Sequence, residues 1–338
     1  METQEGYCPV LWRSIADLGL TGLLIDEAYG GSNGGYAALE RIMEEAGAAL
    51  LLGPFFSSSV LSASLVSQVA DEPFKQDILP KIVSGDLIVS SALTDSRGIW
   101  TEEGVSVDAA QSGDCWILNG ASHFVLDAGI ADVLIVAAID GDEVSLFEVN
   151  GNASGVSTEV SETWDETLRV SRVTYSDVAA RKLVGTSWET CQNAINVARV
   201  ALVGHQVGAA RRIFDMTIDY LKTRIQFGRF IGSFQAMKHM AADLLVEVES
   251  STSAARAAAH ALDSAESDGS ELLDLASFAC ADAFCTVAAS AIQMHGGIAF
   301  TWEHPAHLYL KRARSLAYLF GSPEVHRSNY LTTLENAR

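Results

Sequence analysis

The chain has 338 residues, 49% hydrophobic and 19% charged, a composition that excludes a disordered chain and predicts a substantial folded core. A formal net charge of −21 disfavours nucleic acid and anionic membrane surfaces as partners, which leaves a protein or a small molecule. Five irregularly spaced cysteines (Cys8, Cys115, Cys191, Cys280 and Cys285) without a CxxC pair predict neither a disulfide framework nor a zinc site, which fits a reducing cytoplasm.

The first part of the chain, residues 1–88, is predicted to be an N-terminal helical domain. Apolar residues recur there at helical spacing, and a glycine-rich cluster at 29–35 separates two helices. The opening residues METQEGYCP have no basic region, so no secretory signal is expected. Residues 46–70 are uncharged, but Gly53, Pro54 and a series of serines predict two buried helices with a break, not a membrane span.

Residues 89–184 are predicted to form a central β-barrel or β-sandwich domain. Short β-branched and aromatic runs alternate there with turn signals such as Asn119-Gly120. The expected strands include Cys115–Leu118, Val133–Val136, Val144–Phe147 and Arg172–Tyr175.

Residues 185–338 are predicted to form a C-terminal four-helix bundle, because three long alanine-rich amphipathic stretches occur there. These stretches are Cys191–Thr223, Phe234–Leu262 and Leu272–His295. The expected fold class is therefore α+β multidomain, in the order helical, β, helical. No GxGxxG follows a strand and no GxxxxGK[ST] occurs, which removes the main support for Rossmann and P-loop folds.

Two segments of the helical part combine residue types that suit a dinucleotide. The segment 220–235 lies between two helices and offers a guanidinium fork at Arg224, an aromatic face at Phe227 and an amide at Gln235. The segment Gln293–Gly297 ends the next helix, where paired glycines let backbone amides approach a ligand. The residues alone also fit a solvated arginine in an ordinary turn and a plain helix C-cap.

Together these segments resemble the acyl-CoA dehydrogenase family, whose hallmark is R-x-x-F-G…F-Q followed by Q-x-x-G-G. Further stretches agree, namely LGLTG at 18–22, DEAYGG at 26–31, ILPKIVSG at 78–85, LNG at 118–120 and WDETLR at 164–169. The resemblance covers nearly the whole chain in the right order. It implies the helical–β–helical fold, FAD as cofactor and an oxidoreductase of lipid metabolism that desaturates an acyl-CoA thioester.

The resemblance also assigns cofactor contacts. Six residues would reach across a subunit interface to the FAD of a neighbouring chain, and Thr94 would contact flavin within this chain. The six are Arg224, Phe227, Gln235, Gln293, Gly296 and Gly297. In the family reaction a carboxylate removes the α-proton while the β-hydrogen leaves as hydride, so one glutamate is indispensable.

The sequence departs from the family at that glutamate. Its two known positions correspond to Ala198 and Phe320 here, so the catalytic residue of this chain is unknown. The loop 96–100 lacks the family's proline and glycine residues, and Phe124–Asp127 lacks the hydroxyl that commonly lies near the flavin. The resemblance therefore implies the non-catalytic subunit of an α2β2, steroid-type acyl-CoA dehydrogenase, in which a homologous partner chain carries the glutamate.

Other interpretations remain open at this point. One is a homotetramer with a relocated acid, for which Glu247, Glu249, Glu303 and Glu324 are nearby candidates. Others are a flavin monooxygenase and an acyl-CoA-binding scaffold. His304 and His307 are three residues apart, but no third ligand stands at a telling spacing, so no metal site is expected.

Overall fold

The computed structural model of the chain describes residues 5–113, 115–265 and 268–336, and these fall into two compact units. The first consists of Met1–Gly35 and Leu52–Ala198, the second of Tyr36–Leu51 and Arg199–Arg338. The second unit thus includes a segment from the N-terminal part of the sequence. The helical part of the chain ends at residue 83, strands begin at 89, and helix resumes at 188. These changes lie close to the predicted limits of 88 and 184. The limits as domain boundaries stay a prediction.

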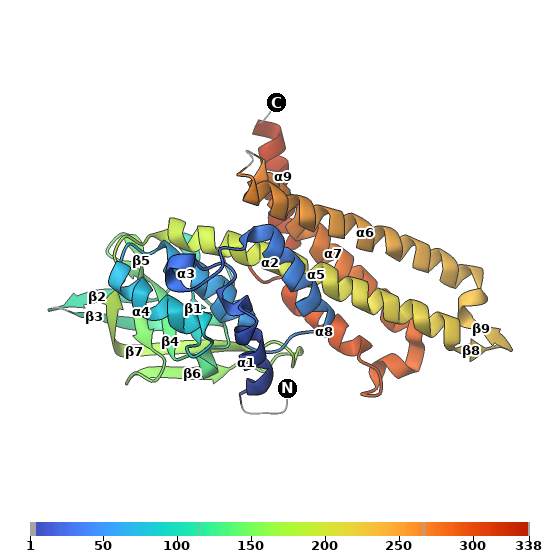
Figure 1. Ribbon diagram of the computed structural model, residues 1–338, viewed down its shortest axis with the longest axis horizontal. Coiled ribbons are helices and arrows are strands. Elements are labelled where there is room, and N and C mark those ends of the chain that lie inside the picture. Colours follow the sequence, from blue (N-terminus) through green and yellow to red (C-terminus); the bar gives the residue numbers. More distant parts are fainter. Residues whose placement is uncertain (1–4, 114, 266–267, 337–338) are drawn as a thin grey trace. The chain divides into compact units, whose positions relative to one another are not determined.

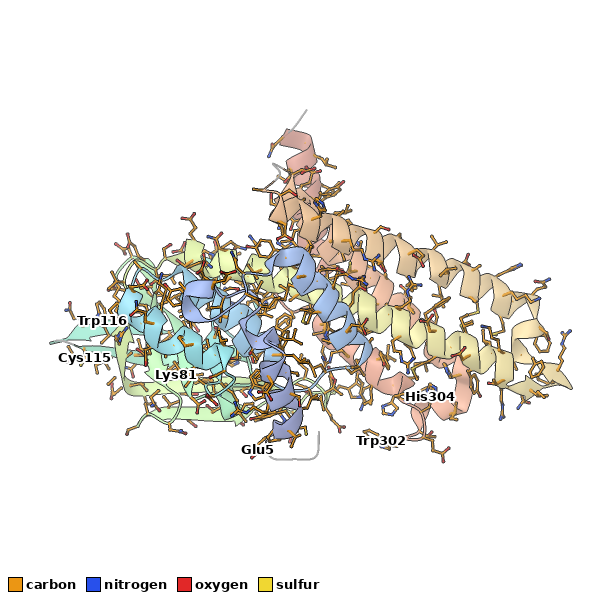
Figure 2. All side chains as sticks on the ribbon, viewed as in Figure 1. Glu5, Lys81, Cys115, Trp116, Trp302 and His304 are labelled. Atoms are coloured by element: carbon orange, nitrogen blue, oxygen red, sulfur yellow. The ribbon has the colours of Figure 1, made fainter. Side chains whose placement is uncertain are left out.

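The first unit begins with short helices. They are α1 (Pro9–Asp17), the 3₁₀ turns η1 (Leu20–Gly22) and η2 (Glu27–Tyr29), the π-helical segment η3 (Phe55–Ser62), α3 (Ala63–Gln68) and α4 (Glu72–Val83). The N-terminus of α4 is fixed by Asp71, whose side chain accepts a hydrogen bond from the Phe74 amide at 3.0 Å. On the exposed side of α4, Lys81 (Figure 2) pairs with Asp77 one turn earlier at 2.6 Å.

The same unit contains a closed β-barrel. Its strands are β1 (Val89–Ala92), β2 (Asp108–Ser112), β3 (Cys115–Leu126), β4 (Val133–Asp140), β5 (Glu143–Asn150), β6 (Val156–Val160) and β7 (Val170–Lys182), and the 3₁₀ turns η4 (Glu102–Gly104) and η5 (Ala128–Ile130) lie between them. The pairings β4–β2, β2–β3, β3–β7, β7–β5 and β5–β4 form a ring, with β1 added to β4 and β6 to β7 (Figure 1). Closing the ring leaves few free strand edges.

The apolar residues of the barrel strands fill the interior of the barrel. Leu118, Leu134, Phe147 and Tyr175 come from four different strands and are all buried in one hydrophobic cluster. Each predicted strand lies within one of β3, β4, β5 and β7, so the central β domain is confirmed. The β3–β7 ladder has irregularities between Leu118 and Gly120 and between Ser122 and Val125, and such bulges bend strands and re-aim side chains.

The second unit is helical. It contains α2 (Gly35–Ala48), α6 (Gln235–Asp263), α7 (Gly269–His295), α8 (Ala306–Leu316), α9 (Pro323–Asn336) and most of α5 (Trp188–Thr223). A hairpin of β8 (Ile225–Gln226) and β9 (Arg229–Phe230), followed by the turn η6 (Ile231–Ser233), joins α5 to α6, and η7 (Gly296–Phe300) follows α7 (Figure 1). The three predicted long helices match α5, α6 and α7.

Four of these helices share one core, which confirms the predicted bundle. Phe214 of α5, Leu244 of α6, Phe284 of α7 and Tyr309 of α8 are buried in the same cluster. With its following turn, α7 is long and apolar enough to cross a membrane by length and composition, and 56% of its most apolar window is buried inside the protein. Burial on that scale is typical of the core helix of a globular domain.

Helix α2 is held against α5 by close backbone contacts. A Cβ atom at Gly47 would lie 2.0 Å from the His205 carbonyl oxygen, and one at Gly208 would lie 1.8 Å from that of Glu44. Only glycine allows two helices to approach so closely. The N-terminus of α2 is capped from α6, because both carboxylate oxygens of Asp263 accept backbone N–H groups, from Tyr36 at 2.6 Å and from Ala37 at 2.7 Å.

Helix α2 also carries a buried carboxyl group, Glu40, which is 1% exposed. Burial, a hydrogen bond to Glu44 and the charge of Glu44 raise the pKa of Glu40 to about 8. Glu44 in turn accepts from the Arg256 guanidinium of α6 at 3.1 Å. In the described part of the chain, the Oε1 atom of Glu40 has no hydrogen-bond partner. Glu40 is thus a neutral acid at physiological pH.

Replacing Glu40 with glutamine is expected to stabilise the protein at neutral and alkaline pH. Because folding raises the pKa of Glu40, its contribution to stability is greatest in acid and is lost as the pH rises towards about 8. The loss amounts to about 1.4 kcal/mol per pH unit over that window. Glutamine carries no charge at any pH, and its amide can still donate to Glu44. The unfolding midpoint of Glu40→Gln, measured from about pH 5 to pH 9, should vary less with pH than that of the wild type.

The matched control is Glu45→Gln, which changes an exposed glutamate of the same helix. This control should keep the wild-type pH dependence. The assignment of a proton to Glu40 is wrong if Glu40→Gln and the wild type lose stability in parallel as the pH rises.

Candidate functional site

An open groove lies at one end of the helical unit. The end of α5, the β8–β9 hairpin, the first turn of α6 and the end of α7 surround a volume of about 800 Å³. Five of the residues predicted to contact a cofactor line it, namely Arg224, Phe227, Gln293, Gly296 and Gly297. The fold therefore brings together two segments that are separated by the whole of α6 and α7.

Phe227 stands at the tip of the hairpin in an unusual conformation. Its φ is +53° and that of Gly228 is +75°, so the two form the centre of a turn that favours Asn-Gly. Phe227 is also 90% exposed, and a bulky residue in the left-handed region costs about 1–3 kcal/mol. Within the described part of the chain, the ring that it meets is that of Phe234, edge-on and 6.2 Å away between centroids. Packing within the chain does not account for a phenylalanine there, whereas an external ring system would.

Arg224 lies within a basic segment of the chain. Residues 220–242 contain two lysines, two arginines and no acid, although the chain as a whole has a net charge of −21. Among the described residues the Arg224 guanidinium forms no ion pair, and its side chain is exposed on the groove. The first turn of α6 adds the side chains and backbone of Ala236 and Met237 to the wall, and helix N-termini favour anions. This end of the unit suits a diphosphate.

The presence of glycine at 296 and at 297 has a different structural reason in each case. Gly296 has φ +67° and ψ −143°, a conformation that is essentially restricted to glycine. Gly297 has no positive φ, and a Cβ atom added there would meet nothing within 4 Å. The fold thus requires glycine at 296 but not at 297. A ligand that must approach the backbone closely would explain the second glycine.

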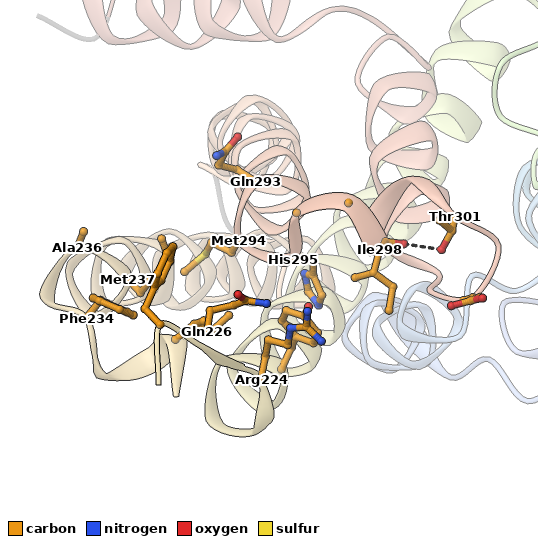
Figure 3. Close-up of a pocket in the computed structure, with 16 residues that line it drawn as sticks. Arg224, Gln226, Phe234, Ala236, Met237, Gln293, Met294, His295, Ile298 and Thr301 are labelled. Atoms are coloured by element: carbon orange, nitrogen blue, oxygen red, sulfur yellow. Dashed lines mark hydrogen bonds between the residues drawn. The ribbon is translucent and has the colours of Figure 1, made fainter. Parts of the chain in front are cut away.

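The two glutamines lie differently around the groove. Gln293 belongs to the groove wall, but Figure 3 shows its side chain extending away from Arg224, on the other side of α7. Gln235 is the first residue of α6; it is exposed and lies beside the groove, outside its lining. Both amides are accessible from outside the chain.

Thr94 is placed in the first unit, after β1. It is 2% exposed, and its hydroxyl donates to the Ile99 carbonyl at 2.6 Å. The loop that follows closes on itself, since the Arg97 guanidinium pairs with Asp95 at 2.7 Å. A flavin contact from Thr94 stays a prediction, and its hydroxyl proton is already used within the loop.

The two positions expected for a glutamate are both buried. Ala198 is fully buried in α5, and Phe320, 3% exposed, follows α8 with φ +62°. The next residue, Gly321, is packed so closely that a Cβ atom would lie 2.9 Å from the His326 ring. His326 belongs to a buried network in which Asp274 pairs with Arg199 at 2.5 Å. Neither position offers a carboxylate to a substrate.

The groove includes residues that the sequence did not single out. Tyr220 and His295 form part of its wall, and the ring of His304 packs against both. Figure 3 shows Gln226 and Arg224 extending towards His295. A histidine beside paired glycines was visible in the sequence, but its ring partners come from two other segments, so the spacing carried no signal.

The groove fits FAD by the chemistry of its donors. It offers an exposed guanidinium for a diphosphate, an exposed aromatic ring for an adenine or flavin face, and an uncovered backbone at Gly297. These groups face outwards from a single chain, so a cofactor held there would also need contacts from another surface.

Comparisons with known proteins agree with this chemistry. The family model "Acyl-CoA dehydrogenase, C-terminal domain" matches residues 185–334, and "Acyl-CoA dehydrogenase, N-terminal domain" matches residues 1–86. The chain is 33% identical to acyl-CoA dehydrogenase IpdE2 of Mycolicibacterium smegmatis, covering 96% of this chain and 87% of that protein. It is 29% identical to acyl-CoA dehydrogenase FadE27 of Mycobacterium tuberculosis, covering 92% and 84%.

Solved structures give the same result. A variant of the steroid acyl-CoA dehydrogenase Tcur3481-Tcur3483 superposes with a TM-score of 0.88 at 27% identity, covering 99% of this chain and 91% of that one. The ChsE4-ChsE5 complex from Mycobacterium tuberculosis superposes with a TM-score of 0.89 at 25% identity, covering 99% and 90%. The chain therefore belongs to the acyl-CoA dehydrogenase family, FAD-dependent oxidoreductases that act on CH–CH bonds.

Proposed function

We propose that this chain is the non-catalytic subunit of a hetero-oligomeric acyl-CoA dehydrogenase. In this proposal it completes the FAD site of a homologous partner chain, and the partner supplies the glutamate that removes the substrate's α-proton. The observation that carries the proposal is an asymmetry. Both glutamate positions are buried and apolar, at Ala198 and Phe320, while the cofactor-contacting groups stand intact on an outward-facing groove.

The chemistry explains why the missing glutamate matters. The α-proton of a thioester is weakly acidic, so its base must be a desolvated carboxylate with access to the substrate. The acids considered for a relocated base, Glu247, Glu249, Glu303 and Glu324, are all exposed. Solvated carboxylates lack the environment that this step needs, which favours the hetero-oligomer over a self-sufficient homotetramer.

The first unit supports the same proposal. In the family position near the flavin, Leu126 is buried, and its carbonyl accepts a hydrogen bond from the Ser90 hydroxyl. Phe124 is 43% exposed with φ +54°, held against Gly98, where a Cβ atom would lie 3.3 Å from its ring. With Thr94 engaged by Ile99, this region offers few hydroxyls for a flavin of the chain's own.

Each groove residue then has a defined task towards the partner's cofactor. The chemistry that FAD supplies when bound is acceptance of the hydride removed from the acyl chain. Arg224 neutralises the diphosphate, Phe227 covers a ring face and excludes water, and the backbone of Gly296 and Gly297 donates hydrogen bonds. None of these tasks moves a proton of the substrate. In this proposal the chain binds and orients, and its partner carries out the chemistry.

The substrate and the setting follow from the relatives. The chain is similar to a steroid acyl-CoA dehydrogenase and to a complex of two acyl-CoA dehydrogenase chains, ChsE4 and ChsE5. We therefore propose an acyl-CoA thioester of a steroid or its degradation product as substrate, a heterotetramer as the assembly and the cytoplasm as its location. A flavin monooxygenase or an acyl-CoA-binding scaffold has no specific observation in its favour.

The stoichiometry of bound flavin tests the proposal. Expressed alone, the chain is expected to be colourless. Co-expressed with a homologue that carries glutamate at the position equivalent to Ala198 or Phe320, it should give a yellow complex with about one flavin for every two chains. Absorbance of the purified complex measures this ratio. A yellow homomeric protein with one flavin per chain, bleached by an acyl-CoA, would overturn the subunit assignment.

Replacing Gly297 with alanine should weaken flavin binding without loss of stability. The conformation and surroundings of Gly297 accept a Cβ atom, so the unfolding midpoint of the flavin-free chain should stay unchanged. A methyl group on the groove wall would push the cofactor off the backbone and lose about tenfold in FAD affinity. Titration of the apo-complex with FAD measures the affinity. Wild-type affinity in this variant would mean that the cofactor does not approach residue 297.

Replacing Phe227 with asparagine should distinguish the conformation of the turn from the contribution of the aromatic ring to ligand binding. Asparagine suits the positive φ of the turn, so the hairpin should be at least as stable as in the wild type. Loss of the aromatic face should weaken FAD binding about tenfold. Phe300→Asn is the matched control, because Phe300 is 75% exposed but lies outside the groove lining. Equal losses of affinity in both variants would contradict a specific role for Phe227.

A further inference from the structure

Three aromatic rings pack together at the groove, two of them face to face and the third tilted against them, and we call them the stack. Tyr220 of α5 and His295 of α7 lie face to face, with ring centroids 4.6 Å apart and planes 27° apart. The ring of His304, in the turn before α8 (Figure 2), lies 4.3 Å from His295 and 6.5 Å from Tyr220. Three segments that are distant in sequence thus meet through these rings.

The hydrogen bonds of the stack fix the position of one proton on each imidazole. The Nδ1 atom of His295 lies 2.8 Å from the Ala291 carbonyl oxygen, which can only accept, so Nδ1 carries a proton. The Nδ1 atom of His304 accepts from the Ala306 amide at 3.2 Å, so its proton is on Nε2. His295 is 4% exposed, and its Nε2 has no partner among the described residues. A second proton on His295 would therefore be buried without an acceptor.

The stack connects the two cofactor-binding segments. Tyr220 lies one helical turn before Arg224, whose amide donates to the Tyr220 carbonyl at 2.9 Å. His295 is the last residue of α7, directly before Gly296 and Gly297. The contact between the Tyr220 and His295 rings therefore joins the end of α5 to the end of α7. Arg224 and the paired glycines, which follow these two ends, both line the groove.

The surroundings keep the stack uncharged at neutral pH. Burial lowers the pKa of His295, and burial together with the nearby His295 and His307 lowers the pKa of His304. Three charged or titratable groups adjoin the stack: Arg224, which follows α5, Glu303 in the turn before α8, and His307 at the start of α8. Among the described residues of α6, the uncharged Ala236 and Met237 line this wall.

We propose that Tyr220, His295 and His304 act as a spacer of uncharged rings that positions Arg224 and Gly296–Gly297 for the FAD diphosphate, and that protonation of the stack releases the cofactor. This inference rests on the proposed function of the groove. The three rings are positioning residues, because they act through the arginine and the glycines. A second proton on His304 would occupy Nδ1, which accepts from the Ala306 amide, so protonation replaces that hydrogen bond with two opposed N–H groups and puts a cation beside His295. The rings then separate and the groove changes width.

The test uses the flavin-bearing complex of this chain with a glutamate-containing homologue. FAD affinity is measured by reconstituting the apo-complex between about pH 8 and pH 5, with circular dichroism recorded at each pH to follow folding. The wild-type complex should lose about tenfold in affinity per pH unit below the apparent pKa of the stack. His304→Phe keeps an aromatic ring that cannot be protonated, so it should bind FAD as the wild type does at pH 8 and lose less than about threefold at pH 5.

Two further variants complete the test. His304→Ala removes the ring and should weaken FAD binding about tenfold already at pH 8, because the spacer is lost. His260→Phe, at an exposed histidine near the other end of α6, should keep the wild-type pH profile. Wild-type affinity of His304→Ala at pH 8 would overturn the spacer. The release mechanism is refuted if His304→Phe follows the wild-type profile, or if flavin leaves only together with the helical signal.

These outcomes are distinct from failure of the proposed function. If no homologous partner yields bound flavin at pH 8 in the wild type, the role of the groove itself is refuted. If flavin binds at pH 8 but its pH profile is insensitive to His304, the proposed function stands and the stack is a packing feature only.

Discussion

The contact between the Tyr220 and His295 rings places the end of α5 against the end of α7, and the geometry of the groove depends on it. Arg224 and Phe227 follow the first ring along the chain, and Gly296 and Gly297 follow the second. Two of these groups have no reason for their position within the chain's own fold: Phe227 is exposed in a strained conformation, and a Cβ atom at Gly297 would meet empty space. Strain and a missing side chain that bring no benefit to the fold itself are best explained by a bound ligand.

Different physical requirements for binding and for catalysis explain how the proposed non-catalytic subunit could lack a base. Binding a diphosphate needs charge and backbone donors on an open surface, whereas abstracting a thioester α-proton needs a carboxylate shielded from water. These requirements involve different parts of the chain, so one can be kept when the other is lost. Here Ala198 and Phe320 are buried apolar residues, and the basic segment 220–242 is retained within a strongly acidic chain. Selection for assembly with a catalytic homologue would keep this combination.

Much of the fold could be predicted from the sequence because its elements follow simple periodicities. The long helices α5, α6 and α7 have alanine-rich amphipathic patterns, and the barrel strands are short β-branched runs between turns. The π-helical segment η3 and the placement of α2 with the C-terminal helices could not be predicted, because both depend on long-range packing such as the approach of Gly47 and Gly208 to backbone. For the groove, the sequence supplied the residues that contact solvent but not the ring stack, since Tyr220, His295 and His304 come together only in three dimensions.

Glu40 shows why a raised pKa alone does not identify a catalytic acid in this family. It has the property that a thioester base needs, because burial and the neighbouring Glu44 raise its pKa to about 8. However, a base must also reach a proton of the substrate. Glu40 is 1% exposed, and its helix, α2, packs directly against the backbone of α5. Its carboxyl group is hydrogen-bonded to Glu44 of the same helix, and Glu44 in turn joins α2 to α6 through Arg256. A catalytic base needs both desolvation and access to the substrate. None of the described acids considered in this chain has both. This is the physical reason to look for the base on another chain.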